Sequence, residues 1–384
     1  MTQGFPNCIG IGVLGYDGVA RAHIHGYTRI RDVFGPEAPL PRLVSVCGRS
    51  QDKLTKAALR YGFEKYTSDW MDLISDDEVK VIDNCAPNNL HSEVCIEAAR
   101  HGKHILCEKP LGRNAEESKR MLEAVQKAGV KHMVSFNYRF VPAVMLAKEL
   151  IDAGKLGKIY HFRARYCDDS LVNPETPFAW RMDKELAGSG VVGDLGSHII
   201  DLARFLVGEF KAVSAMATTF IPERPLREEK GKRGKVTTED AFTATVEFQN
   251  GAIGTLEASG FCPGRKNFNT FEINGSKGTI IFDLERLNEL EVYLDDSSEP
   301  TVNGFRRVMT TDPSHPFCRY WWPTGHIIGW EHTFIHEIYH FLRCIKDGED
   351  VGPIGATFED GYKCAVICDA LLASAESHQK VDIS

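Results

Sequence analysis

Two side chains that could carry acid–base chemistry, Asp194 and His198, stand four residues apart in this sequence. On a helix such positions share one face, so both groups can contact the same small molecule. An imidazole that titrates near neutrality can take a proton while a neighbouring carboxylate orients it. A capping aspartate beside a satisfied, half-buried histidine would give the same pattern. The rest of the chain has to decide between the two interpretations.

The elements around this pair predict a glycine-rich turn that leads into a helix. The turn begins at Gly188-Ser189-Gly190, and helical periodicity continues to Val207, before a C′ glycine at Gly208. Asp201 extends the polar face. One apolar stripe is expected to face a core, and it consists of Leu195, Ile199, Leu202 and Leu206.

A second candidate group is Glu108-Lys109-Pro110, which follows a short apolar strand. Proline keeps the residue before it extended. A lysine held against a cofactor and a buried wall loses solvation, and its pKa falls toward a useful value. A strand-end lysine in solvent is the ordinary alternative.

Length and composition limit the classes of function. The 384 residues are 43% hydrophobic and 26% charged, with a net charge of −8, so we expect two domains and no nucleic-acid or anionic-membrane partner. No apolar run reaches the roughly 18 residues of a membrane span. Residues 1–7 lack a signal pattern, and eleven scattered cysteines suggest reduced thiols in a cytoplasmic protein.

Strands and helices alternate through the first part of the chain, which predicts a parallel, doubly wound Rossmann-type domain over residues 1–138. The expected strands are Cys8–Leu14, Arg42–Cys47, Val79–Cys85, His104–Cys107 and Lys131–Phe136, and the expected helices are Gln51–Tyr61, His91–His101 and Ala115–Ala128. Ligands of such sheets bind beyond the carboxyl ends of the strands.

The turn after the first strand imperfectly matches the dinucleotide fingerprint G-x-G-x-x-G. Gly15 and Ala20 fit the first and third positions, but Asp17 occupies the second. Its carboxylate would repel a pyrophosphate unless it turns away or Gly18 takes over. The second strand ends in Gly48-Arg49-Ser50 rather than in an acid, which leans toward a 2′-phosphate without excluding NAD.

After about residue 140 the pattern changes to period-2 strands, which predicts a second, α+β domain over residues 139–384 with a large, open, mostly antiparallel sheet. A helix at Ala143–Ala153 precedes the strands. The segment Glu223–Lys235 has no periodicity and is expected to be a solvated surface loop. The expected strands are Ile159–Tyr166, Ala212–Phe220, Ala241–Phe248, Ala252–Ser259, Thr270–Asn274, Gly278–Asp283 and Glu291–Leu294, followed by helices Glu331–Lys346 and Phe358–Ser377.

A literal H-E-x-x-H motif, the signature of zinc proteases, occurs at His336–His340. His332 lies one turn earlier on the same face. The spacing places no third ligand, and five-residue motifs recur by chance. We expect no metal and interpret this stretch as a structural helix. The alternatives are a helix that edges the substrate cleft and a zinc peptidase.

The ordered motifs resemble the Gfo/Idh/MocA oxidoreductase family over nearly the whole chain. The motifs are Asp83–His91, Glu108-Lys109-Pro110, Asn137-Tyr138-Arg139, Trp180-Arg181 and Gly193-Asp194 with His198. In that family the lysine and the D-x-x-x-H pair are catalytic, which implies Lys109, Asp194 and His198 here. Ala86 replaces the usual threonine before Pro87, and Asp17 is the other departure.

Within the family, the chain is similar to the levoglucosan-dehydrogenase-like branch, which oxidises the C3 hydroxyl of glucose-derived rings. The similar features are Gly62-Phe63-Glu64, Ser68-Asp69-Trp70, Ala187–Gly190, Ile221–Leu226 and Trp322-Pro323. The resemblance implies an enzyme that transfers hydride between a sugar or glycoside and NAD or NADP. It also implies a dimer or tetramer formed through the second domain's sheet. The alternatives are an inositol dehydrogenase, an enzyme whose tightly held cofactor is recycled by a second sugar, and an idle nucleotide-sensing regulator.

The residues expected at the site fall into two sets. The cofactor set is Gly15, Asp17, Gly18, Val19, Ala20, Gly48, Arg49, Ser50, Ala86, Pro87, Asn88, His91, Glu108, Lys109 and Asn137. The substrate set is Lys109, Asn137, Arg139, Tyr166, Trp180, Asp194, His198, Trp322 and His326.

Overall fold

A computed structural model describes residues 8–229, 231–295 and 300–383. The chain divides into two compact units, one of residues 1–140 and 329–362, the other of residues 141–328 and 363–384. The sequence analysis assigns the segment 329–362 to the second domain, whereas in the structure it packs with the first unit. Residues 1–7, which the sequence analysis interpreted as lacking a signal pattern, lie outside the described residues.

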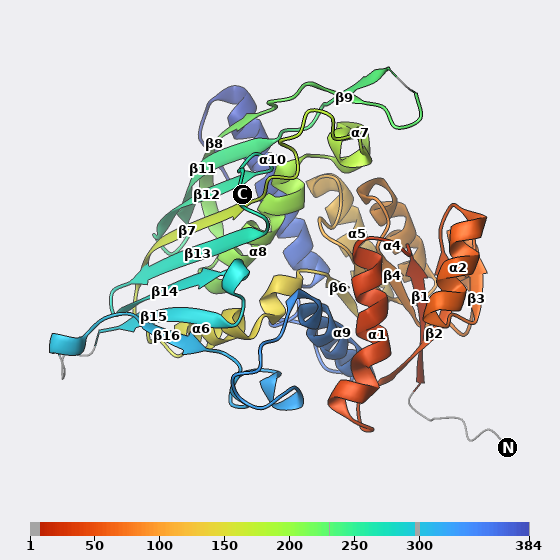
Figure 1. Ribbon diagram of the computed structural model, residues 1–384, viewed down its shortest axis with the longest axis horizontal. Coiled ribbons are helices and arrows are strands. Elements are labelled where there is room, and N and C mark those ends of the chain that lie inside the picture. Colours follow the sequence, from red (N-terminus) through yellow and green to blue (C-terminus); the bar gives the residue numbers. More distant parts are fainter. Residues whose placement is uncertain (1–7, 230, 296–299, 384) are drawn as a thin grey trace. The chain divides into compact units, whose positions relative to one another are not determined.

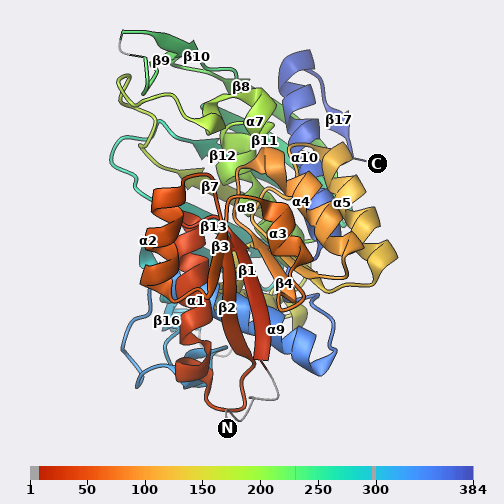
Figure 2. The same ribbon diagram turned by 90° about the vertical axis from the view of Figure 1, so that its right-hand side faces the viewer.

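The first unit contains a six-stranded parallel sheet in the order β3-β2-β1-β4-β5-β6. Figure 2 shows α1 and α2 on one face of this sheet and α4 and α5 on the other. The strands are β1 (Cys8–Leu14), β2 (Leu40–Cys47), β3 (Lys65–Thr67), β4 (Val81–Asn84), β5 (His104–Cys107) and β6 (His132–Val134), and the helices are α1 (Val19–Phe34), α2 (Gln51–Tyr61), α3 (Trp70–Ser75), α4 (His91–Arg100), α5 (Ala115–Ala128) and α9 (Trp330–Asp347).

Burial explains why the strands of this sheet read as continuous apolar runs. In β1 all residues after Cys8 are buried, because helices cover both faces of a doubly wound sheet. The predicted Rossmann-type parallel sheet is therefore confirmed. The late helix α9 packs against α1, which joins the segment 329–362 to this unit.

The second unit contains a nine-stranded sheet in the order β16-β15-β14-β13-β7-β12-β11-β8-β17. Its pairs are antiparallel except β7 with β12, so the predicted mostly antiparallel sheet is confirmed. The strands are β7 (Ile159–Cys167), β8 (Phe210–Thr218), β11 (Ala241–Phe248), β12 (Ile253–Ser259), β13 (Phe268–Gly275), β14 (Gly278–Asp283), β15 (Glu289–Leu294), β16 (Arg306–Met309) and β17 (Val381–Asp382).

Helices cover one face of this sheet and leave the other open. Figure 1 shows α6 and α8 along the covered face. Alternate residues of β11 are buried, as expected for a strand with one covered face. The helices of this unit are α6 (Pro142–Asp152), α7 (Lys184–Ala187), α8 (Ser197–Leu206) and α10 (Phe358–Ser377), the last of which begins in the first unit.

Most described residues of the segment Glu223–Lys235 are exposed, as expected, but the segment is not simply a loop. Its ends pair as the antiparallel strands β9 (Glu223–Pro225) and β10 (Arg233–Lys235). Arg224 is fully buried, and its guanidinium donates hydrogen bonds to the carbonyls of Leu171 at 2.6 Å and Asn173 at 2.7 Å. The lack of periodicity misled the prediction because one buried arginine, rather than an apolar stripe, anchors this hairpin.

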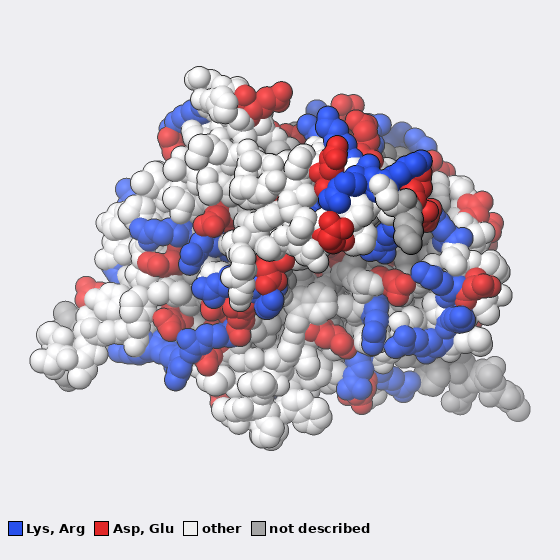
Figure 3. Space-filling view, turned by 45° about the horizontal axis from the view of Figure 1, so that its top comes forward, with Lys and Arg blue, Asp and Glu red and all other residues white. Residues whose placement is uncertain are grey.

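The surface carries interspersed charges of both signs on the face that Figure 3 shows. None of the helices in the described residues combines the length and the apolar composition that a membrane crossing requires. All eleven cysteines lie within the described residues, and all are free thiols.

Candidate active site

The turn between β1 and α1 has the backbone geometry of a phosphate-binding turn. Gly15 has φ 118°, and a Cβ there would lie 3.2 Å from the carbonyl oxygen of Cys85 and 3.3 Å from Cβ of Ala20. Gly18 has φ 59° and directly precedes α1. Asp17 is exposed. The turn therefore leaves the first N–H groups of α1 available to an anion, as a pyrophosphate requires.

The end of β2 carries a glycine because a side chain at this position would clash with its neighbours. A Cβ on Gly48 would lie 2.3 Å from Cε1 of Tyr16, so this ring closes over the position. Arg49 is exposed, and Ser50 is the N-cap residue of α2. An exposed guanidinium and a hydroxyl thus stand where dinucleotide-binding domains contact the adenosine ribose.

The turn after β4 is held by His91, which the sequence analysis placed among the cofactor contacts. This side chain is fully buried, and its Nε2 lies 2.9 Å from the carbonyl oxygen of Ala86 while Nδ1 lies 2.9 Å from that of Pro110. Asn88 is also buried. In this geometry His91 ties the turn after β4 to the turn after β5.

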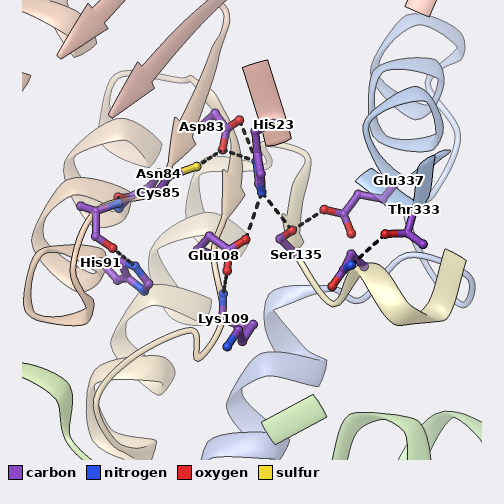
Figure 4. A network of polar contacts seen from close by, with 12 residues as sticks. His23, Asp83, Asn84, Cys85, His91, Glu108, Lys109, Ser135, Thr333 and Glu337 are labelled. Carbon is purple, nitrogen blue, oxygen red and sulfur yellow. Dashed lines mark hydrogen bonds and ion pairs between the residues drawn. The ribbon is translucent and has the colours of Figure 1, made fainter. Parts of the chain in front are cut away.

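Lys109 lies in the turn after β5, and its side chain points away from a buried polar network (Figure 4). Its backbone N–H donates to Oε2 of Glu108 at 3.1 Å. The other oxygen of Glu108 lies 3.0 Å from Nε2 of His23, a fully buried residue of α1. Glu108 thus faces the protein interior and fixes the backbone that carries Lys109.

The H-E-x-x-H residues are occupied by internal contacts of the first unit. Nδ1 of His336 lies 3.0 Å from the carbonyl oxygen of Phe140, and Nε2 of His340 lies 2.8 Å from that of Val351. Glu337 contacts Ser135. Two groups of potential metal ligands occur among the described residues, and neither includes these histidines. The motif is part of a structural helix.

Two residues expected to contact ligands form hydrogen bonds and an ion pair with the segment 329–362. Nδ2 of Asn137 donates to Oγ1 of Thr333 at 2.8 Å. Arg139 is 2% exposed, lies 3.5 Å from the Asp360 carboxylate and donates to the carbonyl of Pro353. The assignment of Arg139 to the sugar remains a prediction.

In the second unit, the glycine-rich stretch is anchored by one partly buried carboxylate. Oε1 of Glu239 accepts hydrogen bonds from the backbone N–H groups of Gly190 at 2.8 Å and Val192 at 2.9 Å. A Cβ on Gly190 would lie 2.1 Å from the carbonyl oxygen of Glu239, so only glycine fits. Burial raises the pKa of Glu239.

The helix that carries the acid–imidazole pair begins differently from the prediction. Residues Val192–Gly196 form a π-helical turn, and the regular α-helix α8 starts only at Ser197. Single π-turns within helices are common at functional sites. The predicted apolar stripe is confirmed as core, since Leu195, Ile199, Leu202 and Leu206 are all at most 9% exposed.

Aromatic and charged side chains surround this pair within the second unit. The rings of Tyr166 and His198 have centroids 5.7 Å apart, and His198 is 6% exposed. Nε of Arg181 lies 3.4 Å from Oδ2 of Asp194, and the guanidinium stacks over Trp180 at 4.3 Å. Tyr166 thus contacts His198 directly, and Arg181 connects Trp180 to Asp194.

The sequence analysis missed two residues beside this group. Burial raises the pKa of Asp168, and the charge of Asp194 adds to that shift. Asn267 accepts a hydrogen bond from the Tyr166 hydroxyl at 2.7 Å. Asp168 directly follows β7, so its place at a strand end was the available signal. Asn267 lies in a loop that has no sequence signal.

Trp322 and His326 lie in the loop after β16, and both are exposed. Nδ1 of His326 lies 2.9 Å from the carbonyl oxygen of Pro323 in the same loop. Their expected contacts with a sugar remain predictions.

Comparison with known proteins gives a consistent result. The model for the oxidoreductase family with an NAD-binding Rossmann fold matches residues 9–136, and the Gfo/Idh/MocA C-terminal domain model matches residues 144–281. Levoglucosan dehydrogenase of Pseudarthrobacter phenanthrenivorans is 42% identical, over 98% of each chain. A solved levoglucosan dehydrogenase in complex with NADH and levoglucosan superposes with a TM-score of 0.92, over 98% of this chain and 99% of that one.

A second curated relative matches more than half of the chain. D-glucoside 3-dehydrogenase of Escherichia coli is 30% identical over 56% of this chain and 62% of its own. Together with the full-length matches, this confirms the resemblance that the sequence motifs indicated. The chain belongs to the Gfo/Idh/MocA family of oxidoreductases and is a nicotinamide-dependent dehydrogenase.

Proposed function

We propose that this sugar dehydrogenase removes hydride from C3 of a glucose-type ring and yields a 3-oxo sugar or 3-oxo glycoside. One observation carries the proposal. The chain is similar over nearly its whole length to levoglucosan dehydrogenase, whose solved complex holds NADH and levoglucosan. The likeness to D-glucoside 3-dehydrogenase supports C3 as the position of oxidation.

The first unit has the features that a nicotinamide dinucleotide needs. Gly15 and Gly18 adopt positive φ, and the N-terminus of α1 offers N–H groups to the pyrophosphate. When bound, the nicotinamide ring supplies the hydride acceptor. Arg49 and Ser50 suit the 2′-phosphate of NADP as well as the hydroxyls of NAD, so both cofactors belong in the test.

The catalytic roles follow from what hydride removal demands. A carbinol that loses hydride becomes a protonated carbonyl unless a base takes the hydroxyl proton. We assign this task to His198, oriented by Asp194. Lys109 donates a hydrogen bond to the same substrate oxygen and so stabilises the negative charge that develops there.

Contacts to the sugar are assigned to the residues that gather around this pair. The Trp180 and Tyr166 rings suit the apolar face of a pyranose, and Arg181 and Asp168 offer polar partners for its hydroxyls. Aromatic faces and charged hydrogen-bonding groups are what a sugar site combines.

The test is a matrix of substrates and cofactors. Levoglucosan, methyl glucosides, glucose and inositols are each incubated with NAD and with NADP, and the absorbance of the reduced cofactor is followed. The proposal predicts turnover with the glucose-type compounds. Turnover confined to inositols would replace it with the inositol dehydrogenase alternative. Sugar oxidation seen only when a second keto sugar is added would establish the recycled, tightly held cofactor.

Variants test the residue roles. Lys109→Ala and His198→Ala are expected to lower turnover by about 10²–10⁴-fold while NADH still binds, because each removes a proton-handling group. Lys119→Ala, at an exposed position of α5, is the matched control and should retain full activity. Near-normal turnover in both active-site variants would refute the assignment.

The open face of the nine-stranded sheet is the surface we assign to self-association. It exposes Met216 and Ile253, which are 69% and 51% accessible, and it holds a shallow trough of about 660 Å³. Large exposed apolar groups on one sheet face are typical of an interface. The free cysteines support a cytoplasmic location, where thiols stay reduced.

A further inference from the structure

A chain of buried polar side chains joins the ends of three parallel strands to α1 and α9 (Figure 4). His23 lies on α1 and is fully buried. Asp83 lies in β4, Glu108 follows β5 and Ser135 follows β6, so the carboxyl ends of neighbouring strands bring them together. The proposed function uses none of these groups directly.

The geometry around the His23 ring requires an additional proton. Nδ1 lies 3.1 and 3.0 Å from the two oxygens of Asp83, and Nε2 lies 3.0 Å from Oε1 of Glu108. A neutral imidazole has one N–H donor, and its other nitrogen presents a lone pair. A lone pair opposite a buried carboxylate would be repelled. Two carboxylates on opposite ring nitrogens therefore call for an imidazolium that donates to both.

The electrostatics of the cluster agree with this geometry. Burial alone lowers the pKa of His23, but the charge and hydrogen bond of Asp83, together with the contributions of Cys85, outweigh it, and the pKa stands well above its usual value. Burial likewise raises the pKa of Glu108, yet the hydrogen bond and charge of His23, together with Lys109 and His91, bring that pKa below its usual value. Both partners are thus held in their charged forms.

The other titratable groups around the ring are accounted for. Burial raises the pKa of Glu337 to about 8, so at neutral pH this carboxyl is protonated. Its neighbour Ser135 lies 3.3 Å from Nε2 of His23. The Cys85 thiol donates to Asp83 at 3.4 Å, and burial raises the pKa of Tyr27 on the same helix. In addition, Lys109 and His91 act on the charge of Glu108.

Glu108 connects His23 to the turn after β5 that carries Lys109. One oxygen of Glu108 faces His23, and the other accepts the backbone N–H of Lys109 at 3.1 Å. His23 lies one turn into α1, whose N-terminus is the proposed pyrophosphate site. A single buried cation therefore connects the cofactor helix to the backbone that carries Lys109.

We propose that His23 is a positioning residue of the dehydrogenase reaction, a permanent buried imidazolium that holds Glu108, and through it Lys109, against the cofactor helix α1. The role in hydride transfer rests on the proposed function. The charge state of His23 and its pairing with Glu108 do not depend on it.

The first experiment needs no activity. In protein labelled with ¹⁵N at histidine, long-range ¹H–¹⁵N correlation spectra report the protonation of both ring nitrogens, and a His23→Gln variant identifies the His23 signals. We expect both nitrogens to stay protonated as the pH rises through about 6.5, the ordinary pKa near which surface imidazoles lose a proton. A neutral His23 ring at pH 7 would overturn the proposal.

The second experiment is a rescue. His23→Gln leaves the buried Glu108 carboxylate without a cation, and we expect kcat to fall by about 10²-fold through misplacement of Lys109, with a smaller change in KM. Adding Glu108→Gln removes that unpaired charge and restores the net charge that the network has in the wild type. The side-chain amide at position 23 then donates to Asp83 and accepts a hydrogen bond from the side-chain amide at position 108. The carbonyl oxygen of the amide at position 108 accepts the backbone N–H of Lys109. This double variant should recover at least tenfold of the lost kcat.

A loss of packing alone would not be repaired by changing Glu108, so a double variant no better than His23→Gln would refute the positioning role. His340→Gln controls for substitution of a buried histidine, and it should keep kcat within about twofold because its ring contacts the Val351 carbonyl, Cys344 and the Phe140 ring rather than the His23 network. If the wild type oxidised no sugar, the proposed function would fail while the NMR result still decided the charge of His23. NADH affinity of the single and double variants then serves as the rescue readout.

Discussion

Glu337 in α9 provides a quantitative test of the buried network in the first unit. Its side chain is fully buried, it contacts Ser135, and burial raises its pKa to about 8 from a usual value of 4.5. The folded protein therefore holds a proton that the unfolded chain releases between these two values. Stability from this group is complete at low pH and is lost as the pH rises toward 8.

The magnitude follows from the two pKa values. Between about pH 5.5 and about pH 7.5, a carboxyl with these pKa values loses about 2.5 kcal/mol of its contribution to the free energy of unfolding. Glu337→Gln keeps an acceptor for Ser135 and removes the titration. His23 also stabilises the fold less as the pH rises through its raised pKa, but it is present in both proteins and cancels in the comparison.

The assay is guanidinium denaturation of the wild type and of Glu337→Gln across this pH range. We expect the wild type to lose about 2.5 kcal/mol relative to the variant. Glu116→Gln, at an exposed position of α5, is the control and should run parallel to the wild type. Parallel pH profiles of Glu337→Gln and the wild type would show that Glu337 is ionised in the fold, and would refute this description of the network.

Three further predictions concern other parts of the chain. Glu239→Ala leaves the backbone N–H groups of Gly190 and Val192 without their acceptor. We therefore expect chemical denaturation to show a free energy of unfolding lower by about 1–3 kcal/mol, and we expect a raised KM for the sugar. If both quantities were unchanged, the anchoring role of Glu239 would be contradicted. Arg224→Met removes two hydrogen bonds to the carbonyls of Leu171 and Asn173 and should make the loop around Leu171 sensitive to limited proteolysis, whereas wild-type resistance would count against it. Arg49→Ala should lower kcat/KM for NADP about tenfold more than for NAD if the guanidinium meets a 2′-phosphate, and equal effects would exclude that contact.

The sequence predicted the fold well wherever the pattern of apolar residues along an element matches the burial of its faces. The strands of the first unit are buried on both faces, so their apolar runs were readable, and the alternation in β11 marked a half-covered sheet. Segment 329–362 was placed with the second domain because periodicity shows that α9 is a helix without showing what it packs against. The hairpin of β9 and β10 was missed because its anchor is a single buried arginine.

The candidate site was predictable only in part. The spacing of Asp194 and His198, and the position of Lys109 after a strand, identified the groups that could do chemistry. Glu108 and His91 were taken for cofactor contacts, yet both turn inward to fix turns. Partners that meet only in three dimensions, such as His23 with Asp83, leave no local pattern. The π-turn before α8 likewise depends on Glu239, more than forty residues further along the chain.

The central claim is that hydride passes from C3 of a glucose-type ring to the nicotinamide. Levoglucosan carrying deuterium at C3 tests it most directly, with the reduced cofactor analysed by mass spectrometry after one round of oxidation. The account predicts that the reduced cofactor contains the deuterium. Reduced cofactor without the label would place oxidation at another carbon, and no reduced cofactor from any glucose-type sugar would contradict the proposed function.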